Sequence, residues 1–163
     1  MGAEDAAGVL ALNHAWQHFT SPLDAQSLER LRGAAAPALV AGSRGAIIAC
    51  VLALPEGLDY ASPNYRWFCN HYARFLYVDR VVVAADQQRR GIGAGLYGEI
   101  MAAARRQSVP LVVCELDADN HSSAAFHDRL GFAEVARERL GDGHKLVSLR
   151  VRQVAPAAAP ADT

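Results

Sequence analysis

The sequence predicts one α+β domain over residues 1–154, with a mixed central sheet flanked by helices. Two apolar runs, at 75–83 and 111–116, enclose an amphipathic helix that reaches Gln107, and such a unit places its two strands parallel with a right-handed crossover. Two further strand-like segments, at 133–140 and 145–154, are separated by Gly141-Asp142-Gly143, which predicts an antiparallel hairpin. A length of 163 residues and 52% apolar content are sufficient for a single core.

The segments before this unit predict two helices and a pair of strands. Apolar residues recur at helical spacing along 5–18 and form one stripe of Val9, Leu12, Trp16 and Phe19. Ser21-Pro22 predicts the start of a second helix, because serine is a favoured N-cap and proline fits the first helical position, and Gly33 can end it. Strands are expected at 38–41 and 46–54, with a turn between them.

Residues 55–74 predict a long connection that is rich in aromatic side chains. A connection of this length is usually functional or covers an apolar surface. The aromatic residues are therefore expected either over a sheet edge or a homodimer contact, or at the substrate: Tyr60, Tyr65, Trp67, Phe68 and Tyr72. The last segment, 155–163, is rich in alanine and proline and is expected to be a disordered tail.

Residues 88–96 predict a binding site for a phosphate-bearing ligand. They follow a strand and open a helix, where backbone N–H groups have no intrahelical acceptor and the helix dipole favours an anion. Gly91 and Gly93 leave the backbone open to close approach, and Arg89 and Arg90 can donate charge-assisted hydrogen bonds to phosphate.

Two common phosphate-binding motifs are alternatives for this segment. Gly93-Ala94-Gly95-Leu96-Tyr97-Gly98 has the G-x-G-x-x-G spacing of dinucleotide folds, with Glu115 or Asp117 near the distance of a ribose-binding acid. That motif requires its first glycine directly after the strand, whereas nine residues separate Val83 from Gly93. A P-loop requires a lysine after the glycines, and the only lysine is Lys145.

A third interpretation comes from two motifs taken together. Gln88-Arg89-Arg90-Gly91-Ile92-Gly93 matches the pattern Q/R-x-x-G-x-G/A at a strand-to-helix junction. Asn120, a short helical segment and the turn Leu130-Gly131-Phe132 follow after one further strand. In this order and spacing the chain resembles the GNAT superfamily of N-acetyltransferases over residues 5–154, and 67–83 resembles a subgroup of predicted bacterial acetyltransferases. That superfamily usually begins with a strand before its first helix, which this chain lacks at the expected place.

The resemblance implies an acetyl-CoA-dependent N-acetyltransferase that moves the acetyl group directly to a primary amine. It implies cofactor contacts from the strand backbone, from the pyrophosphate turn and from the far side: Val81, Val82 and Val83; Gln88, Arg89, Arg90, Gly91, Ile92, Gly93 and Ala94; Asn120, Ser122 and Phe126. Two parallel strands that separate would leave backbone groups for the pantetheine amides to satisfy.

Acetyl transfer needs the amine as its free base, so a proton acceptor is required. If the strand has no bulge, Tyr77, Asp79, Val81 and Val83 share one face, and Asp79 is the only carboxylate among them. Asp79 is therefore the candidate base, with an ion pair to Arg74 or Arg80 as the alternative. Tyr77 stands where relatives often carry a carboxylate on this strand. His127 stands where many relatives carry a tyrosine that hydrogen-bonds the leaving sulfur, although a helix-terminal structural role is also open.

Composition restricts the remaining function classes. Sixteen basic and 17 acidic residues give a pI of about 6.6, unlike a nucleic-acid-binding domain. No signal peptide or membrane-length apolar run is present, so a cytoplasmic protein is expected. No metal is expected, since His14 and His18 lack a third ligand. The expected partner is a small-molecule or peptide amine. A non-catalytic CoA-binding regulatory module and a nucleotide-dependent oxidoreductase remain the alternatives.

Overall fold

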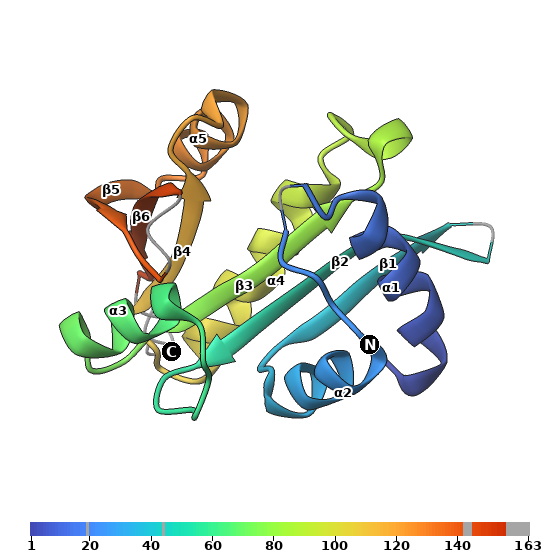
Figure 1. The fold of residues 1–163 in the computed structure, drawn as a ribbon, viewed down its shortest axis with the longest axis horizontal. Coiled ribbons are helices and arrows are strands. Elements are labelled where there is room, and N and C mark those ends of the chain that lie inside the picture. Colours follow the sequence, from blue (N-terminus) through green and yellow to red (C-terminus); the bar gives the residue numbers. More distant parts are fainter. Residues whose placement is uncertain (19, 44, 142–144, 156–163) are drawn as a thin grey trace, which may run out of the picture.

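A six-stranded mixed sheet forms the centre of the computed structural model, which describes residues 1–18, 20–43, 45–141 and 145–155 (Figure 1). The strands lie in the order β1-β2-β3-β4-β6-β5, and β3 and β4 are the parallel pair. Their bounds are β1 Ala38–Ser43, β2 Ala46–Pro55, β3 Leu76–Val83, β4 Leu111–Asp117, β5 Ala133–Arg139 and β6 Leu146–Gln153. The predicted α+β class, the crossover unit and the closing hairpin strands are confirmed.

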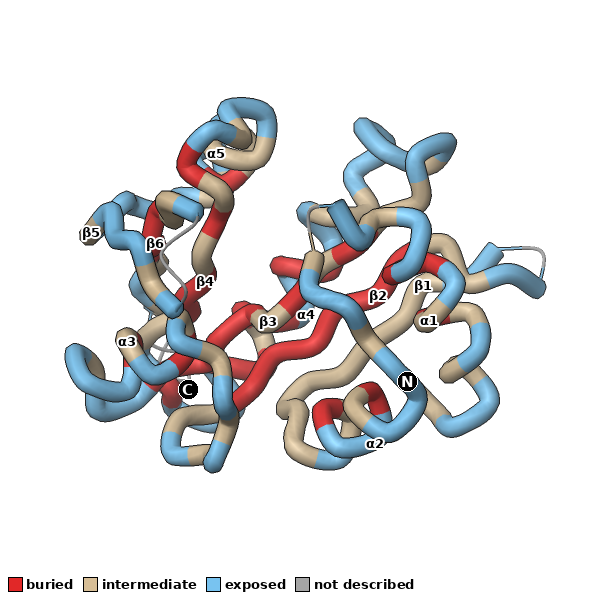
Figure 2. Tube along the Cα trace, viewed as in Figure 1, coloured by how far each residue is buried: buried red, intermediate tan, exposed pale blue. Residues whose placement is uncertain are grey.

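Helices cover both faces of this sheet. Their bounds are α1 Ala6–Ala15, α2 Ala25–Ala34, α3 Pro63–His71, α4 Ile92–Arg106 and α5 His121–Arg129, with short 3₁₀ turns at Ala3–Asp5 and Ala85–Gln87. One hydrophobic cluster joins α4 to the sheet, and a second joins α1, α2 and α3 to its opposite face. Figure 2 shows the buried residues concentrated along β2 and β3.

Two of the predicted local elements are wrong. The second helix begins after Asp24, whose Oδ1 accepts a hydrogen bond from the Ser27 amide at 2.7 Å, so Ser21-Pro22 lies in the preceding loop. The predicted connection at 55–74 contains α3, which has the same serine–proline signature at Ser62 and Pro63. Tyr65 and Phe68 of that helix are buried in the core, and this packing explains why the segment is rich in aromatic residues.

The sheet has no strand before α1 in the described part of the chain, and β1 is its edge. The predicted disordered tail at 155–163 lies outside the described residues except for Ala155. Among the helices that the structure describes, none is long and apolar enough to span a bilayer.

Candidate active site

The main cavity lies where β3 and β4 separate. The two strands pair only at Leu76–Val112 and Tyr77–Val113, and beyond these pairs their backbones diverge (Figure 1). The cavity between them has a volume of about 770 Å³. Its walls come from the loop after α1, the C-terminal half of β3, the turn before α4, the end of β4, and α5. The predicted separation of the parallel strands is therefore present, and it produces a site large enough for an extended ligand.

Most of the residues predicted to hold the cofactor line this cavity. They are Val81, Val82, Val83, Gln88, Arg89, Gly91, Ile92, Gly93, Ala94, Asn120, Ser122 and Phe126. Arg90 is not among the lining residues, because its guanidinium points to the loop and donates to the side chain of Gln87. The residue set thus forms one continuous surface from β3 to α5, with Arg90 outside it.

The turn before α4 has the geometry of an anion site. Gly91 is the N-cap with a φ of 82°, in the left-handed region, and no side chain caps the first turn of the 15-residue helix. A Cβ on Gly93 would lie 3.3 Å from the Phe126 ring, so the backbone is closely packed there. Free N–H groups, a positive helix end and glycine backbone together fit the pyrophosphate of a CoA molecule.

Helix geometry excludes the dinucleotide alternative. Gly93, Gly95 and Gly98 all lie inside α4, whereas that motif needs its first glycine in the strand-to-helix turn. The sheet also has a single parallel pair among the described strands rather than a doubly wound core. The nucleotide-dependent oxidoreductase is therefore not supported by the fold.

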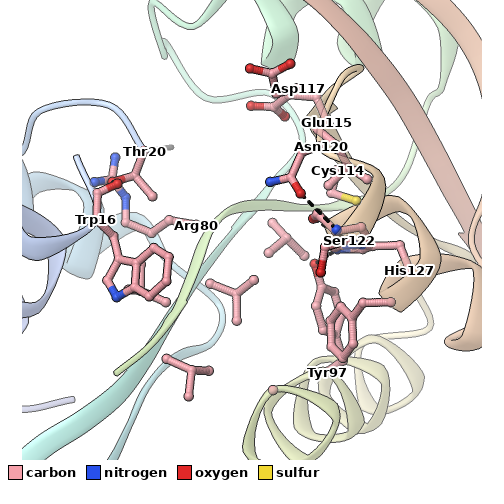
Figure 3. Close-up of a pocket in the computed structure, with 18 of the residues that line it drawn as sticks. Trp16, Thr20, Arg80, Tyr97, Cys114, Glu115, Asp117, Asn120, Ser122 and His127 are labelled. Carbon is pink, nitrogen blue, oxygen red and sulfur yellow. Dashed lines mark hydrogen bonds between the residues drawn. The ribbon is translucent and has the colours of Figure 1, made fainter. Parts of the chain in front are cut away.

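Asn120 orients the opposite wall. Its Oδ1 caps α5 by accepting from the Ser123 amide at 3.0 Å, and Figure 3 shows its amide nitrogen directed toward the cavity. This places a hydrogen-bond donor beside Ser122 and the C-terminal end of β4. Such a group suits an amide-rich ligand arm.

A bulge in β3 corrects the predicted alternation of its side chains. Leu52 pairs with Arg80 and Ala53 with Val78, so Asp79 is an extra residue in the ladder. After the bulge, Val81 and Val83 pack toward α4, while Tyr77 packs with the opposite cluster. The prediction that these residues share one face is wrong because an inserted residue reverses the alternation.

Asp79 lines the cavity but its carboxylate is fully engaged. Its Oδ2 accepts from Arg80 Nε at 2.7 Å, its Oδ1 accepts from the Tyr60 hydroxyl at 2.5 Å, and its side chain is 4% exposed. The ion pair that the sequence left as an alternative is thus present with Arg80. Each carboxylate oxygen already accepts one hydrogen bond, so an amine at Asp79 would share the carboxylate with Arg80 and Tyr60.

Glu115 is a second carboxylate at the cavity, and sequence reasoning did not assign it to proton transfer. It lies on β4 between the buried residues Cys114 and Leu116 and lines the cavity, and its Oε2 is buried and has no hydrogen-bond partner among the described residues. Burial raises its pKa to about 7, while hydrogen bonds from Tyr77 and Asn64 act in the opposite direction. A base with a pKa near neutrality and an unused acceptor oxygen is suited to receive a proton from an amine.

Tyr77 and Glu115 therefore belong to one cluster. Tyr77 is fully buried and its hydroxyl hydrogen-bonds Glu115, and burial raises the pKa of Tyr77 well above its usual value. It does not line the cavity, and its neutral hydroxyl is a hydrogen-bond donor to the Glu115 carboxylate. A lone carboxylate in the apolar run 111–116 was the sequence signal for this position.

His127 lines the cavity with both ring nitrogens occupied. Nδ1 lies 2.8 Å from the Ser123 carbonyl oxygen and must carry the proton, so Nε2 accepts from the Tyr97 hydroxyl at 2.7 Å. Burial lowers the pKa of His127, which keeps the ring neutral at pH 7. In this arrangement, a direct proton donation from His127 to a sulfur would require one of these bonds to break.

We expect His127→Phe to destabilise the fold. The substitution leaves the buried Tyr97 hydroxyl without an acceptor, which costs about 1–3 kcal/mol in the free energy of unfolding, measured by urea denaturation. The matched control is the double variant that combines Tyr97→Phe with His127→Phe. It removes both hydrogen-bond partners, so it should restore part of the lost free energy of unfolding. A turnover that falls roughly tenfold or more in His127→Phe, with unchanged stability, would instead support the donor role.

Comparison with known proteins agrees with this architecture. The model of the Acetyltransferase (GNAT) family matches residues 8–132. The ribosomal-protein-S18-alanine N-acetyltransferase of Escherichia coli superposes with a TM-score of 0.70 at 16% identity, covering 100% of this chain and 96% of that one. Naa20 of Chaetomium thermophilum, in complex with a bisubstrate analogue, gives 0.77 at 19% identity and covers 94% and 84%.

A third similar structure contains the acetyl donor. YncA of Salmonella typhimurium, with its cofactor acetyl-CoA, gives a TM-score of 0.69 at 21% identity and covers 100% of this chain and 96% of that one. A search of curated proteins returns no match to this sequence. In the described part of the chain, no group of three or more His, Cys, Asp or Glu side chains is placed to hold a metal ion.

Proposed function

The chain belongs to the GNAT acetyltransferase family, and we propose that it transfers the acetyl group of acetyl-CoA directly to a primary amine with Glu115 as the general base. The observation that carries the proposal is the unpartnered Glu115 Oε2 at the cavity where β3 and β4 separate. A ligand N–H at this oxygen would satisfy the one buried side-chain acceptor that has no partner among the residues that the structure describes.

The residues present fit acetyl-CoA. Val81, Val82 and Val83 line the gap between the strands, where backbone groups of β3 that are not paired with β2 would bind the pantetheine amides, and the turn at Gly91 would bind the pyrophosphate. Arg89 and Gln88 line the same turn and can add hydrogen bonds to phosphate oxygens. The bound thioester supplies an activated acetyl group, and the protein supplies position and proton transfer.

Glu115 would take the proton that the amine loses. Its conjugate acid has a pKa of about 7, so a substantial share is ionised at neutral pH and can accept a proton. Tyr77 and Asn64 hydrogen-bond the carboxylate and keep it in place. His127 and Tyr97 line the same cavity, and the Tyr97 hydroxyl donates to His127 Nε2.

The acceptor is a primary amine, and an assay over several classes of amine would identify which class it is. One structural neighbour acts on an alanine of a ribosomal protein and another is bound to a bisubstrate analogue, which favours a peptide amine as the first class to test. A thiol-release assay would compare a peptide beginning with alanine, Nα-acetyl-lysine, spermidine and an aminoglycoside. Release of CoA with none of these amines would favour the non-catalytic CoA-binding module.

We expect acetyl-CoA to stabilise the fold. A ligand that binds only the native state adds about 2.7 kcal/mol at a hundredfold excess over its dissociation constant. For a chain of this size, that free energy corresponds to a rise of roughly 5–10 °C in Tm. The measurement is a thermal melt with acetyl-CoA and, as the control, with NAD. A Tm raised by NAD and not by acetyl-CoA would contradict the assignment of the cavity.

A further inference from the structure

The segment after α1 forms one wall of the cavity. Trp16, Gln17, His18, Thr20 and Ser21 all line it. Figure 3 shows Trp16, Thr20 and Arg80 together on one side, with Glu115 and Asn120 on the other. This wall therefore faces the candidate base Glu115 across the end of β3, and the space between the wall and Glu115 is here called the acceptor half of the cavity. A loop in this place needs an anchor if the space beside Glu115 is to keep its width.

Arg80 supplies that anchor from β3. Its Nη1 donates to the Asn13 Oδ1 at 2.8 Å and to the Ser21 carbonyl oxygen at 3.4 Å. Asn13 also donates from Nδ2 to the same carbonyl at 3.2 Å, so the three residues form a closed group. One guanidinium thus joins the strand, the end of α1 and the loop that follows it.

The bulge explains why Arg80 points to this wall. Without the inserted Asp79, Arg80 would face α4, whereas here it lies on the side of α1. Asp79 then compensates the buried charge through Nε, and the Tyr60 hydroxyl holds Asp79 in turn. The fork geometry of arginine allows these contacts at once, which the single ammonium of lysine cannot reproduce.

We propose that Arg80 is a positioning residue that fixes the wall formed by Trp16, Gln17, His18, Thr20 and Ser21 and thereby sets the shape of the acceptor half of the cavity. The inference rests on the proposed function only in naming that half the acceptor side. Small displacements of a binding wall change how a reactant is held against a catalytic group, so the effect falls on acceptor binding more than on acetyl-CoA binding.

Asn13→Leu tests this tether without removing the buried ion pair. Leucine has a similar size, leaves Arg80 bound to Asp79, and removes the bonds that connect α1 to the guanidinium and to Ser21. The chain has two tryptophans, so in a Trp67→Phe background the fluorescence reports Trp16 in the wall. We expect Asn13→Leu to increase acrylamide quenching of Trp16. We also expect it to raise KM by about tenfold for the panel amine with the highest turnover, and to leave acetyl-CoA affinity unchanged.

Two further variants separate the contributions. Asn13→Asp keeps an acceptor oxygen for Arg80 but loses the donor to Ser21, so its quenching and KM should return toward those of the parent. Arg80→Lys keeps the charge beside Asp79 and should behave like Asn13→Leu. It also provides the test if the Asn13→Leu protein does not fold. Arg74→Met is the control, because it removes an exposed arginine that pairs with Glu56 outside the cavity.

The outcomes distinguish the tether from the reaction. Folded Asn13→Leu and Arg80→Lys proteins with parental quenching and parental KM would overturn the proposal. Equal effects in Asn13→Asp and Asn13→Leu would assign the wall to the Asn13–Ser21 bond and also overturn it. Fluorescence quenching needs no acceptor, so a chain that acetylates no amine contradicts the proposed function while the tether is still tested.

Discussion

Glu115→Gln is expected to lower kcat/KM at pH 7.5 by roughly 10²–10⁴, the range of a positioned general base. Glutamine keeps the size of the side chain and can still hydrogen-bond Tyr77 and Asn64, but it cannot accept the proton of the amine. Acetyl-CoA affinity, measured by calorimetry, should stay within about twofold, because the substitution removes a group needed for the chemistry and not one that holds the cofactor.

The matched control is Asp117→Asn on the same strand. Asp117 also lines the cavity, but its side chain is 35% exposed and pairs with Lys145 at 3.6 Å. We expect a small loss of turnover in this variant. Equal losses in both variants would indicate that the cavity needs negative charge rather than a base at Glu115, and an active Glu115→Gln protein would remove Glu115 from the mechanism.

The pH dependence of turnover and of stability gives a second test of Glu115 as the base. In the parent, turnover should decline as pH falls through about 7, since protonation of Glu115 removes the base. The stability effect has the opposite sense. The native pKa of about 7 lies above the ordinary 4.5, so the native state binds the proton more tightly and the free energy of unfolding falls as pH rises from 4.5 to 7. Glu115→Gln lacks this loss and should gain stability relative to the parent between pH 5 and pH 8.

Local sequence patterns were sufficient for the centre of the fold. The crossover unit, the glycine turn before α4 and the short helix after Asn120 depend on residues close in sequence, so they could be assigned from local patterns and motifs. The serine–proline pair at 21–22 misled because α2 is capped by Asp24 instead, while the same pair at 62–63 does begin a helix. Identical local signals are therefore decided by tertiary packing.

The candidate base could not be assigned in the same way. Choosing between Asp79 and Glu115 depends on a bulge in β3 and on the partners that each carboxylate finds across the sheet. A bulge is an irregularity in the pairing of two strands, so the sequence of one strand does not reveal it. His127 illustrates the same limit, because its partner Tyr97 lies 30 residues away on another helix.

The second large effect is expected at Gly91. Gly91→Val should reduce acetyl-CoA affinity by at least about tenfold, because each charge-assisted hydrogen bond lost from the turn is worth about 1.5–3 kcal/mol. The new side chain would meet no protein atom within 4 Å, so it would extend into the open space of the cavity where the pyrophosphate is expected. The positive φ of 82° adds backbone strain of about 1–2 kcal/mol in the free energy of unfolding.

Gly57→Val separates that strain from the loss of binding. Gly57 has a φ of 81°, also has no neighbouring atom within 4 Å of an added Cβ, and does not line the cavity. Both variants should therefore lose a similar amount of stability in urea denaturation, while calorimetry should find weakened acetyl-CoA binding in Gly91→Val alone. Parental affinity in a folded Gly91→Val protein would mean that the phosphates are not held at the start of α4, and the cofactor would then have to approach the separated strands from another side.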